Sequence, residues 1–176
     1  MRAPFCAAWL VGDGLFLLAD RLLKFWANSG GSAPRLVGRW LGWQPFFNQG
    51  VAFSLPVPNG VTIVLTVVIL GVLIGKVWQL GKAARRETSV NRQPTTANSK
   101  VSSQSFPCLL LTDYCLLFIA YCLIITGALS NFYDRIFYQH TVDYLLVFTG
   151  VFNLADVMIV MGGILYLKSQ RLRLKD

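Results

Sequence analysis

The chain has 176 residues, of which 55% are hydrophobic, and its mean hydropathy is +0.54. This composition is too apolar for an ordinary soluble domain, and it favours a single integral membrane unit covering residues 1–176. Sixteen Lys and Arg against eight Asp and Glu give a net charge of +8. That excess fits basic membrane flanks and attraction to anionic lipid, and it is poor evidence for nucleic-acid binding.

Four apolar stretches are long enough, or nearly so, to cross a bilayer. A spanning helix needs about 20 apolar residues because the hydrocarbon core is about 30 Å thick. The sequence therefore predicts an all-α integral membrane protein with four transmembrane helices, at about residues 5–26, 61–80, 108–129 and 151–168. The first could be a cleaved signal peptide, but it has no small-x-small cleavage site and ends in "ADRLLKFW", which favours a retained helix.

The segments that connect these spans differ in composition. Residues 27–60 are rich in aromatics, Gly and Pro, and we expect Phe46 to Leu55 to form a short extended segment at the membrane surface. It could line a groove for an extended peptide or act as an interfacial anchor. Residues 81–107 are predicted to be a flexible polar loop, and residues 169–176 a short tail.

The basic residues predict the orientation, because Lys and Arg accumulate on the cytoplasmic side of a membrane. Eleven of the sixteen fall at the N-terminus, in the middle loop and in the tail: Arg2, Lys76, Lys82, Arg85, Arg86, Arg92, Lys100, Lys168, Arg171, Arg173 and Lys175. Both termini should therefore be cytoplasmic.

Neither the cysteines nor the one histidine predict a metal site. Cys108, Cys115 and Cys122 repeat every seven residues within one apolar span, which is typical of a helix-packing face. The sequence predicts no cofactor.

The acidic residues are the main functional signal. An ionised carboxylate is costly in lipid, so acids near spans usually face a protein interior, a cavity or a partner. Four of them map to the outer ends of the first, third and fourth spans: Asp20, Asp134, Asp143 and Asp156. Their common depth indicates a site at the outer leaflet. Asp13 lies mid-span, where it either pairs across helices or stays protonated.

Short spacings strengthen this interpretation. Asn131 precedes Asp134 by three residues and Arg135 by four, so on a helix the three share a face. Asn153 likewise precedes Asp156 by three, at a helix start that favours negative charge. Because few residues separate Asp143 from Asn153, the chain must turn back promptly, and the two acids could then meet face to face.

Two facing carboxylates suggest aspartic protease chemistry, because such a pair shares one proton and can act as base and acid together. The alternative is a structural ion pair that joins helix ends, with Arg135, Arg21 or Lys24 as the cation. A Ser/Lys peptidase would use Ser54 or Ser130 with Lys24, and a zinc protease is disfavoured by the absence of His-Glu-x-x-His. A non-catalytic four-helix transporter or assembly subunit would use the acids to carry ions or tie helices together.

Five motifs resemble those of the lipoprotein signal peptidases, also called signal peptidase II. "DRLLK" at 20–24 is similar to the family's Asp-x-x-x-Lys, and "FFNQGVAFS" at 46–54 to its Asn-x-Gly-x-Ala-Phe-Ser. "GALSNFYDR" at 127–135, "TVDY" at 141–144 and "FNLAD" at 152–156 resemble its remaining blocks in the same order. The chain departs from the pattern at Thr126, Ser130 and Arg21, and in its longer polar cytoplasmic loop.

The resemblance implies a bacterial inner-membrane aspartyl endopeptidase that cleaves diacylglyceryl-modified prolipoproteins just before the lipidated cysteine. It implies four helices, a small extracytoplasmic β-like cradle, and an active site near the extracytoplasmic face. The implied catalytic pair is Asp143 and Asp156. Substrate-binding or site-shaping roles would fall on Asp20, Lys24, Asn48, Gly50, Asn131, Arg135, Asn153 and Ala155. The implied partners are prolipoprotein substrates and membrane lipids.

Overall fold

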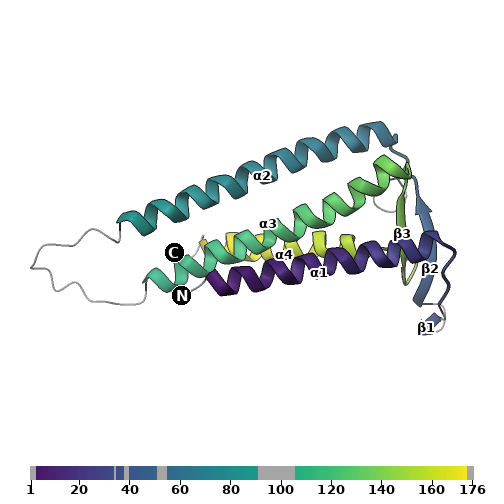
Figure 1. Cartoon of the computed structure of the whole chain (residues 1–176), viewed down its shortest axis with the longest axis horizontal. Coiled ribbons are helices and arrows are strands. Elements are labelled where there is room, and N and C mark those ends of the chain that lie inside the picture. Colours follow the sequence, from purple (N-terminus) through teal and green to yellow (C-terminus); the bar gives the residue numbers. More distant parts are fainter. Residues whose placement is uncertain (1–2, 34, 38–39, 51–54, 91–105, 174–176) are drawn as a thin grey trace, which may run out of the picture.

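Four long helices form most of the protein. The computed structural model describes residues 3–33, 35–37, 40–50, 55–90 and 106–173. The helices are α1 (Ala3–Asn28), α2 (Asn59–Val90), α3 (Phe106–Phe137) and α4 (Leu154–Arg173). They run lengthwise in Figure 1, with the start of α1 and the end of α4 at one end of the molecule and a small sheet across the other, which we call the sheet end.

The sheet has four antiparallel strands in the order β1-β2-β3-β4. β1 (Arg35–Val37) and β2 (Leu41–Asn48) lie between α1 and α2, and β3 (Thr141–Val147) and β4 (Gly150–Phe152) lie between α3 and α4. The structure confirms the expected mainly helical fold of four helices, and the small sheet agrees with the expected β-like cradle. β2 begins before the expected segment Phe46–Leu55, and residues 51–54 of that segment lie outside the described residues.

All four helices extend beyond the predicted spans, and α4 continues to Arg173, into the predicted tail 169–176. α2 runs to Val90 and α3 begins at Phe106, so the predicted loop 81–107 is shorter than expected, and residues 91–105 lie outside the described part of the chain. The extension of α2 carries charged residues such as Lys82 and Arg85, which are exposed. A helix satisfies its own backbone hydrogen bonds, so α2 has no need to stop where its apolar residues end.

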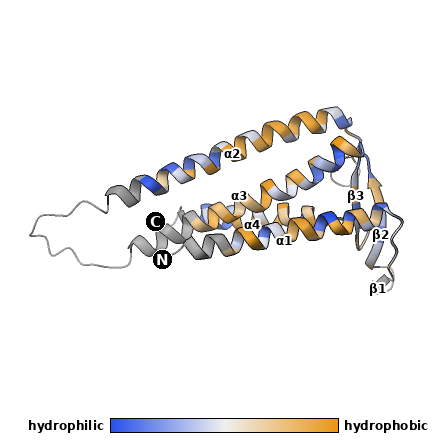
Figure 2. Ribbon diagram, viewed as in Figure 1, coloured by the Kyte–Doolittle hydropathy of each residue, from blue (hydrophilic) through white to orange (hydrophobic). Residues whose placement is uncertain are grey.

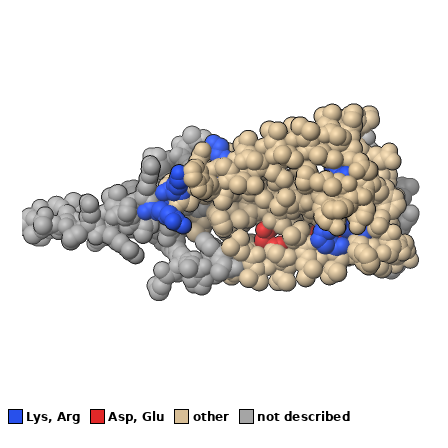
Figure 3. Space-filling model, turned by 45° about the horizontal axis from the view of Figure 1, so that its top comes forward, with Lys and Arg blue, Asp and Glu red and all other residues tan. Residues whose placement is uncertain are grey.

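The distribution of polarity is the reverse of that in a soluble protein. The largest fully buried side chains are mostly polar, among them Lys24, Asp20, Asp134 and Asn153, while large apolar side chains along α2 such as Val64 and Val72 are exposed. Orange, hydrophobic residues cover much of the helices in Figure 2. On the face drawn in Figure 3 the surface between the two ends is largely uncharged, with Lys and Arg toward both ends. Such an exposed apolar belt indicates contact with lipid.

Within the described residues, two helical segments are long and apolar enough to cross a membrane, Asn59–Ala83 and Cys115–Phe137. α1 and α4 have polar residues near the sheet end, including Lys24 and Asp156, that turn toward the protein interior. These residues lower the apolar content of both helices, while their outward faces still expose residues such as Leu22 and Val160.

Small residues let α3 and α4 approach closely. A Cβ added at Gly127 of α3 would lie 2.5 Å from the carbonyl oxygen of Ala155, and one at Gly162 of α4 would lie 2.7 Å from that of Ala120. Close backbone approach through small residues is a common way for helices to pack in membranes. It places the start of α4, which carries Asp156, directly against α3.

Candidate active site

A cavity of about 710 Å³ lies at the sheet end. α2, α3 and α4 and the strands β2, β3 and β4 all contribute to its wall, and the sequence-predicted residues that line it are Asn48, Asn131, Arg135, Asp143 and Asp156. The other predicted site residues, Asp20, Lys24, Gly50, Asn153 and Ala155, lie behind this wall. The structure thus brings both predicted catalytic carboxylates to one cavity.

Asp143 projects from the middle of β3, where it is 2% exposed and opposite Phe46 of β2. Its Oδ1 accepts a 2.6 Å hydrogen bond from the Asn153 side-chain amide, and its Oδ2 accepts one of 3.3 Å from the Asn48 amide. Asn48 is itself oriented because its Oδ1 accepts a hydrogen bond from the Gly50 backbone N–H. Two amide donors therefore fix the Asp143 carboxylate.

Asp156 lies in the first turn of α4 and forms a reciprocal cap with Asn153. The Asp156 backbone N–H donates to Asn153 Oδ1 at 2.9 Å, and the Asn153 backbone N–H donates to Asp156 Oδ2 at 3.2 Å. This arrangement satisfies helix-start donors that have no partner within the helix. Since the Asn153 side chain also donates to Asp143, this one residue contacts both carboxylates, Asp143 through its side-chain amide and Asp156 through its backbone N–H.

Lys24 connects this pair to α1. Its ammonium, 1% exposed, lies 2.7 Å from Asn131 Oδ1, 2.8 Å from Asp134 and 3.2 Å from Asp20. The Asn131 side-chain NH₂ then donates to Asp156 Oδ1 at 2.8 Å. Lys24 therefore fixes which way the Asn131 amide points, and the amide presents a donor to Asp156.

Asp134 does not line the cavity and instead forms buried ion pairs. It is fully buried, 2.6 Å from Arg21 and 2.8 Å from Lys24. Asn131 and Asp134 both contact Lys24, as a shared helix face predicts, but only Asn131 and Arg135 line the cavity, because Asp134 points toward α1. Its ion-pair partners are Arg21 and Lys24, and Arg135 points elsewhere.

Arg135 joins the cavity to the start of α2. Its guanidinium donates to the Gly50 carbonyl oxygen and, at 3.4 Å, to Asn59 Oδ1. The Asn59 amide donates in return to the Arg135 carbonyl oxygen at 3.1 Å. The Arg135 charge acts on both Asp143 and Asp156. The role of Asn59 was missed in the sequence, because nothing local distinguishes it from an ordinary helix cap.

Asp20 receives donors from three elements. Its Oδ2 accepts from Ser130 and faces Lys24, and its Oδ1 accepts from the Tyr144 hydroxyl at 3.0 Å and the Ala155 backbone N–H at 3.2 Å. Ala155 is fully buried, and its small side chain allows this contact. Tyr144 was not predicted as a site residue, since its neighbour Asp143 gave the only chemical signal in "TVDY".

The electrostatics of Asp143 are unusual for a carboxyl group. Burial, and then the charge of Asp156, raise the pKa of Asp143 from 3.8 to about 7, against the opposing hydrogen bonds from Asn153 and Asn48. Burial also raises the pKa of Tyr144, followed by the charge of Asp20. Asp143 is therefore able to hold a proton near neutral pH.

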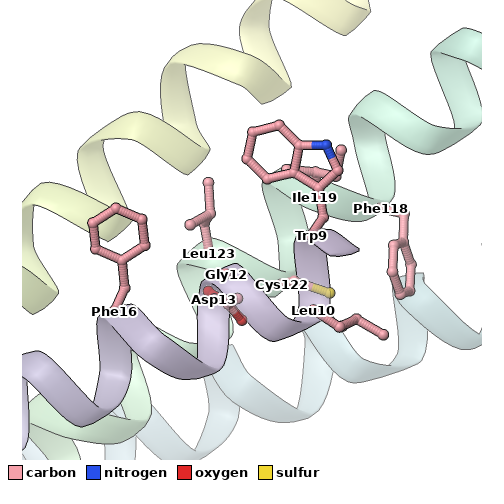
Figure 4. Close-up of a pocket in the computed structure, with 9 residues that line it drawn as sticks. All are labelled: Trp9, Leu10, Gly12, Asp13, Phe16, Phe118, Ile119, Cys122 and Leu123. Carbon is pink, nitrogen blue, oxygen red and sulfur yellow. The ribbon is translucent and has the colours of Figure 1, made fainter. Parts of the chain in front are cut away.

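Asp13 is remote from this cavity. It lines a small apolar cavity of about 40 Å³ between α1 and α3, shown in Figure 4. The Thr126 hydroxyl donates to Asp13 Oδ2 at 2.6 Å, which confirms pairing across helices as one of the two expectations for this residue.

The geometry disfavours a Ser/Lys pair. The Lys24 ammonium lies 3.4 Å from Ser130 Oγ, but it also forms ion pairs with Asp20 and Asp134. Ser54 lies outside the described residues. Among the residues that the structure describes, no group of three or more His, Cys, Asp or Glu side chains is placed to hold a metal ion.

Comparisons with known proteins find one family. The model of the signal peptidase (SPase) II family matches residues 102–170, which include both cavity carboxylates. The lipoprotein signal peptidase of Clostridium novyi is 27% identical over 158 residues, covering 85% of this chain and 87% of the relative. The chain therefore resembles the signal peptidase II family. A second signal peptidase relative, from Mycobacterium leprae, is 31% identical over 142 residues, covering 77% of this chain and 55% of its own.

Two solved bacterial membrane enzymes share the fold. One, determined at 2.3 Å by the in meso method, superposes with a TM-score of 0.66 at 16% identity, covering 93% of this chain and 87% of its own. The other, at 1.9 Å, gives 0.62 at 18% identity, covering 93% and 92%. The chain therefore shares its fold with these two proteins.

Proposed function

We propose that this protein is an aspartic endopeptidase that removes signal peptides from diacylglyceryl-modified prolipoproteins by cleavage just before the lipidated cysteine. The observation that carries the proposal is the pair Asp143 and Asp156, which line one cavity and are both contacted by Asn153. The names of the similar proteins, all lipoprotein signal peptidases, support the substrate class.

The charges around the pair support a single shared proton. The contacts described above join four carboxylates (Asp20, Asp134, Asp143 and Asp156) to three cations (Arg21, Lys24 and Arg135). One proton on the pair makes this group neutral, which is the favourable state for buried charges. Because burial raises the pKa of Asp143, we place that proton on Asp143 and the negative charge on Asp156, which lies at the start of α4 where the helix dipole favours it.

The reaction then follows general acid–base chemistry. Asp156 takes a proton from a water molecule as the water oxygen attacks the scissile carbonyl carbon, and Asp143 gives its proton to the carbonyl oxygen. When the C–N bond breaks, the amine takes the proton from Asp156 and a hydroxyl of the intermediate returns one to Asp143. Both carboxyl groups end as they began.

The cavity wall has two chemically different sides that suit a lipidated peptide. Polar groups come from the sheet and α3, whereas Phe132, Ile159 and Val160 present apolar side chains between the helices. We infer that acyl chains enter between the helices while the peptide lies across the Asn48 loop. All four helices span a bacterial cytoplasmic membrane, both termini are cytoplasmic, and the site is near the extracytoplasmic face.

A transporter or assembly subunit is the less favoured function. Ion transport requires acids distributed through the bilayer depth. Four acids instead gather at the sheet end, and Asp13 is held by Thr126.

The test is cleavage of a purified prolipoprotein with and without the diacylglyceryl group, read by mass spectrometry. The proposal predicts cleavage before the modified cysteine, and slow or absent cleavage of the unmodified precursor. Equal cleavage of the two precursors would contradict the role given to the lipid, and no cleavage of either by folded protein would contradict the activity.

A further inference from the structure

Tyr144 follows Asp143 on β3 but lies on the other side of the strand. Successive strand residues point to opposite faces. Asp143 accordingly lines the cavity, whereas the Tyr144 ring packs with Ala27 and Val142 in a small apolar cluster. Tyr144 is 3% exposed, so its hydroxyl acts on neighbouring protein groups and does not reach the cavity.

The Tyr144 hydroxyl joins three elements at one atom. It donates to Asp20 Oδ1 of α1 at 3.0 Å and accepts a hydrogen bond of 3.0 Å from the backbone N–H of Leu154. Leu154 is the first residue of α4, where a backbone N–H has no partner within the helix. A side chain of β3 therefore supplies a cap for the helix that carries Asp156.

The first turn of α4 depends on such outside partners. Three successive backbone N–H groups, those of Leu154, Ala155 and Asp156, donate to Tyr144, Asp20 and Asn153 respectively. None of these acceptors belongs to α4. Since Asp143 adjoins Tyr144 and Asp156 belongs to the capped turn, these bonds set where the two carboxylates lie relative to each other.

We propose that Tyr144 is a positioning residue for the cleavage reaction: its hydroxyl holds the first turn of α4 against β3 and so keeps Asp156 at the distance from Asp143 at which they share a proton. This inference rests on the proposed function. Replacing Tyr144 by Phe keeps the ring packing but leaves the Leu154 N–H without its acceptor and removes one donor from Asp20.

The variant should also change the pH dependence. The charged groups that act on the carboxylate pair are Asp20 and Lys24 from α1 and Arg135 from α3. None of them is replaced in Tyr144→Phe, although Asp20 loses one hydrogen bond. If the pair moves apart, its mutual repulsion weakens and the shared proton is lost at lower pH. The alkaline limb of the rate profile therefore moves to lower pH.

The test compares purified full-length wild type, Tyr144→Phe and Tyr166→Phe on diacylglyceryl-modified prolipoprotein. Tyr166 is also on α4 but packs against Tyr121, away from the site. We expect Tyr144→Phe to lower kcat about 10- to 100-fold with KM nearly unchanged, because small misplacement of reacting groups has effects of that order. Tyr166→Phe should behave as wild type.

A Tyr144→Phe profile that matches Tyr166→Phe in kcat and in its alkaline limb overturns the inference while leaving the proposed function intact. Failure of wild type to cleave overturns the proposed function instead. Hydrogen exchange of wild type in detergent tests the positioning separately: the Leu154 and Ala155 amides should exchange slowly although they begin a helix. Rapid exchange of Leu154 in wild type overturns the inference even where the variant does not fold.

Discussion

Replacing Asp143 by Asn should make the protein more stable at alkaline pH while removing its activity. Asp143 has a pKa of about 7 in the fold and an ordinary value of 3.8. Below about pH 4 the group is protonated in the folded and unfolded chains alike. Between these two pKa values the folded chain binds more protons than the unfolded chain. The free energy of unfolding that Asp143 contributes is therefore greatest at low pH and is lost as the pH rises from 3.8 to about 7.

The magnitude follows from the same two values. One pKa unit corresponds to about 1.4 kcal/mol, so the range from 3.8 to about 7 corresponds to about 4 kcal/mol. Asn stays neutral and its carbonyl oxygen can still accept from Asn153, so Asp143→Asn avoids this loss. The 3.3 Å hydrogen bond from Asn48 is lost, because the new NH₂ group at position 143 faces the Asn48 NH₂ group. This loss costs about 1 kcal/mol and does not depend on pH.

The assay is thermal unfolding in detergent from pH 5 to pH 9, followed by circular dichroism. The difference between the unfolding midpoints of Asp143→Asn and wild type should increase with pH, until Asp143→Asn melts about 10 °C higher at pH 9. Asp134→Asn is the control: it leaves Arg21 and Lys24 short of a partner and should lower the midpoint at every pH. Midpoints of wild type and Asp143→Asn that stay parallel across this range would refute the reasoning.

Three further substitutions test packing, capping and the ion pairs. Gly162→Ala should lower the free energy of unfolding by about 1–3 kcal/mol, since its Cβ would lie 2.6 Å from Ile124 Cγ1. Its control is Gly163→Ala, whose Cβ would meet nothing within 4 Å and which should be neutral or stabilising in the same thermal unfolding assay. Asn153→Asp keeps the cap on α4 but replaces the donor to Asp143 with a carboxylate, so cleavage at pH 7 should fall more than about 100-fold while folding at pH 5 is retained; an active variant would contradict the role of that donor. Arg21→Gln removes one cation of the cluster and leaves buried Asp134 with Lys24 alone, so it should reduce stability by about 1–3 kcal/mol and move the alkaline limb of the cleavage profile to higher pH; an unchanged profile would contradict the charge balance.

Much of the fold could be predicted from the sequence because the relevant signals are local. Long apolar runs predicted the four helices, and acids at their outer ends predicted a shared site. The sheet was harder, since β3 and β4 lie in the short apolar run of residues 141–152, whose pattern does not separate strand from helix. The helix ends were also misplaced, because charged residues such as Lys82 continue α2 past its apolar part.

Site residues with local signals could also be predicted, whereas those that depend on distant contacts could not. Asn153 and Asp156 could be paired in advance because their spacing is that of a helix cap. The cation of a structural ion pair could be narrowed only to Arg135, Arg21 or Lys24, since helical spacing alone does not show that the Asp134 carboxylate turns toward α1. Tyr144 was missed because its function depends on contacts with α1 and α4, more than 100 and about ten positions away respectively.

The most direct measurement is cleavage of a diacylglyceryl-modified prolipoprotein by wild type and by the Asp143→Asn, Asp156→Asn and Asp134→Asn variants, each shown to be folded. The proton-sharing pair predicts that cleavage is abolished in the first two variants and retained by the folded fraction of the third. Near-wild-type cleavage by Asp143→Asn or Asp156→Asn would contradict the assignment of the catalytic pair.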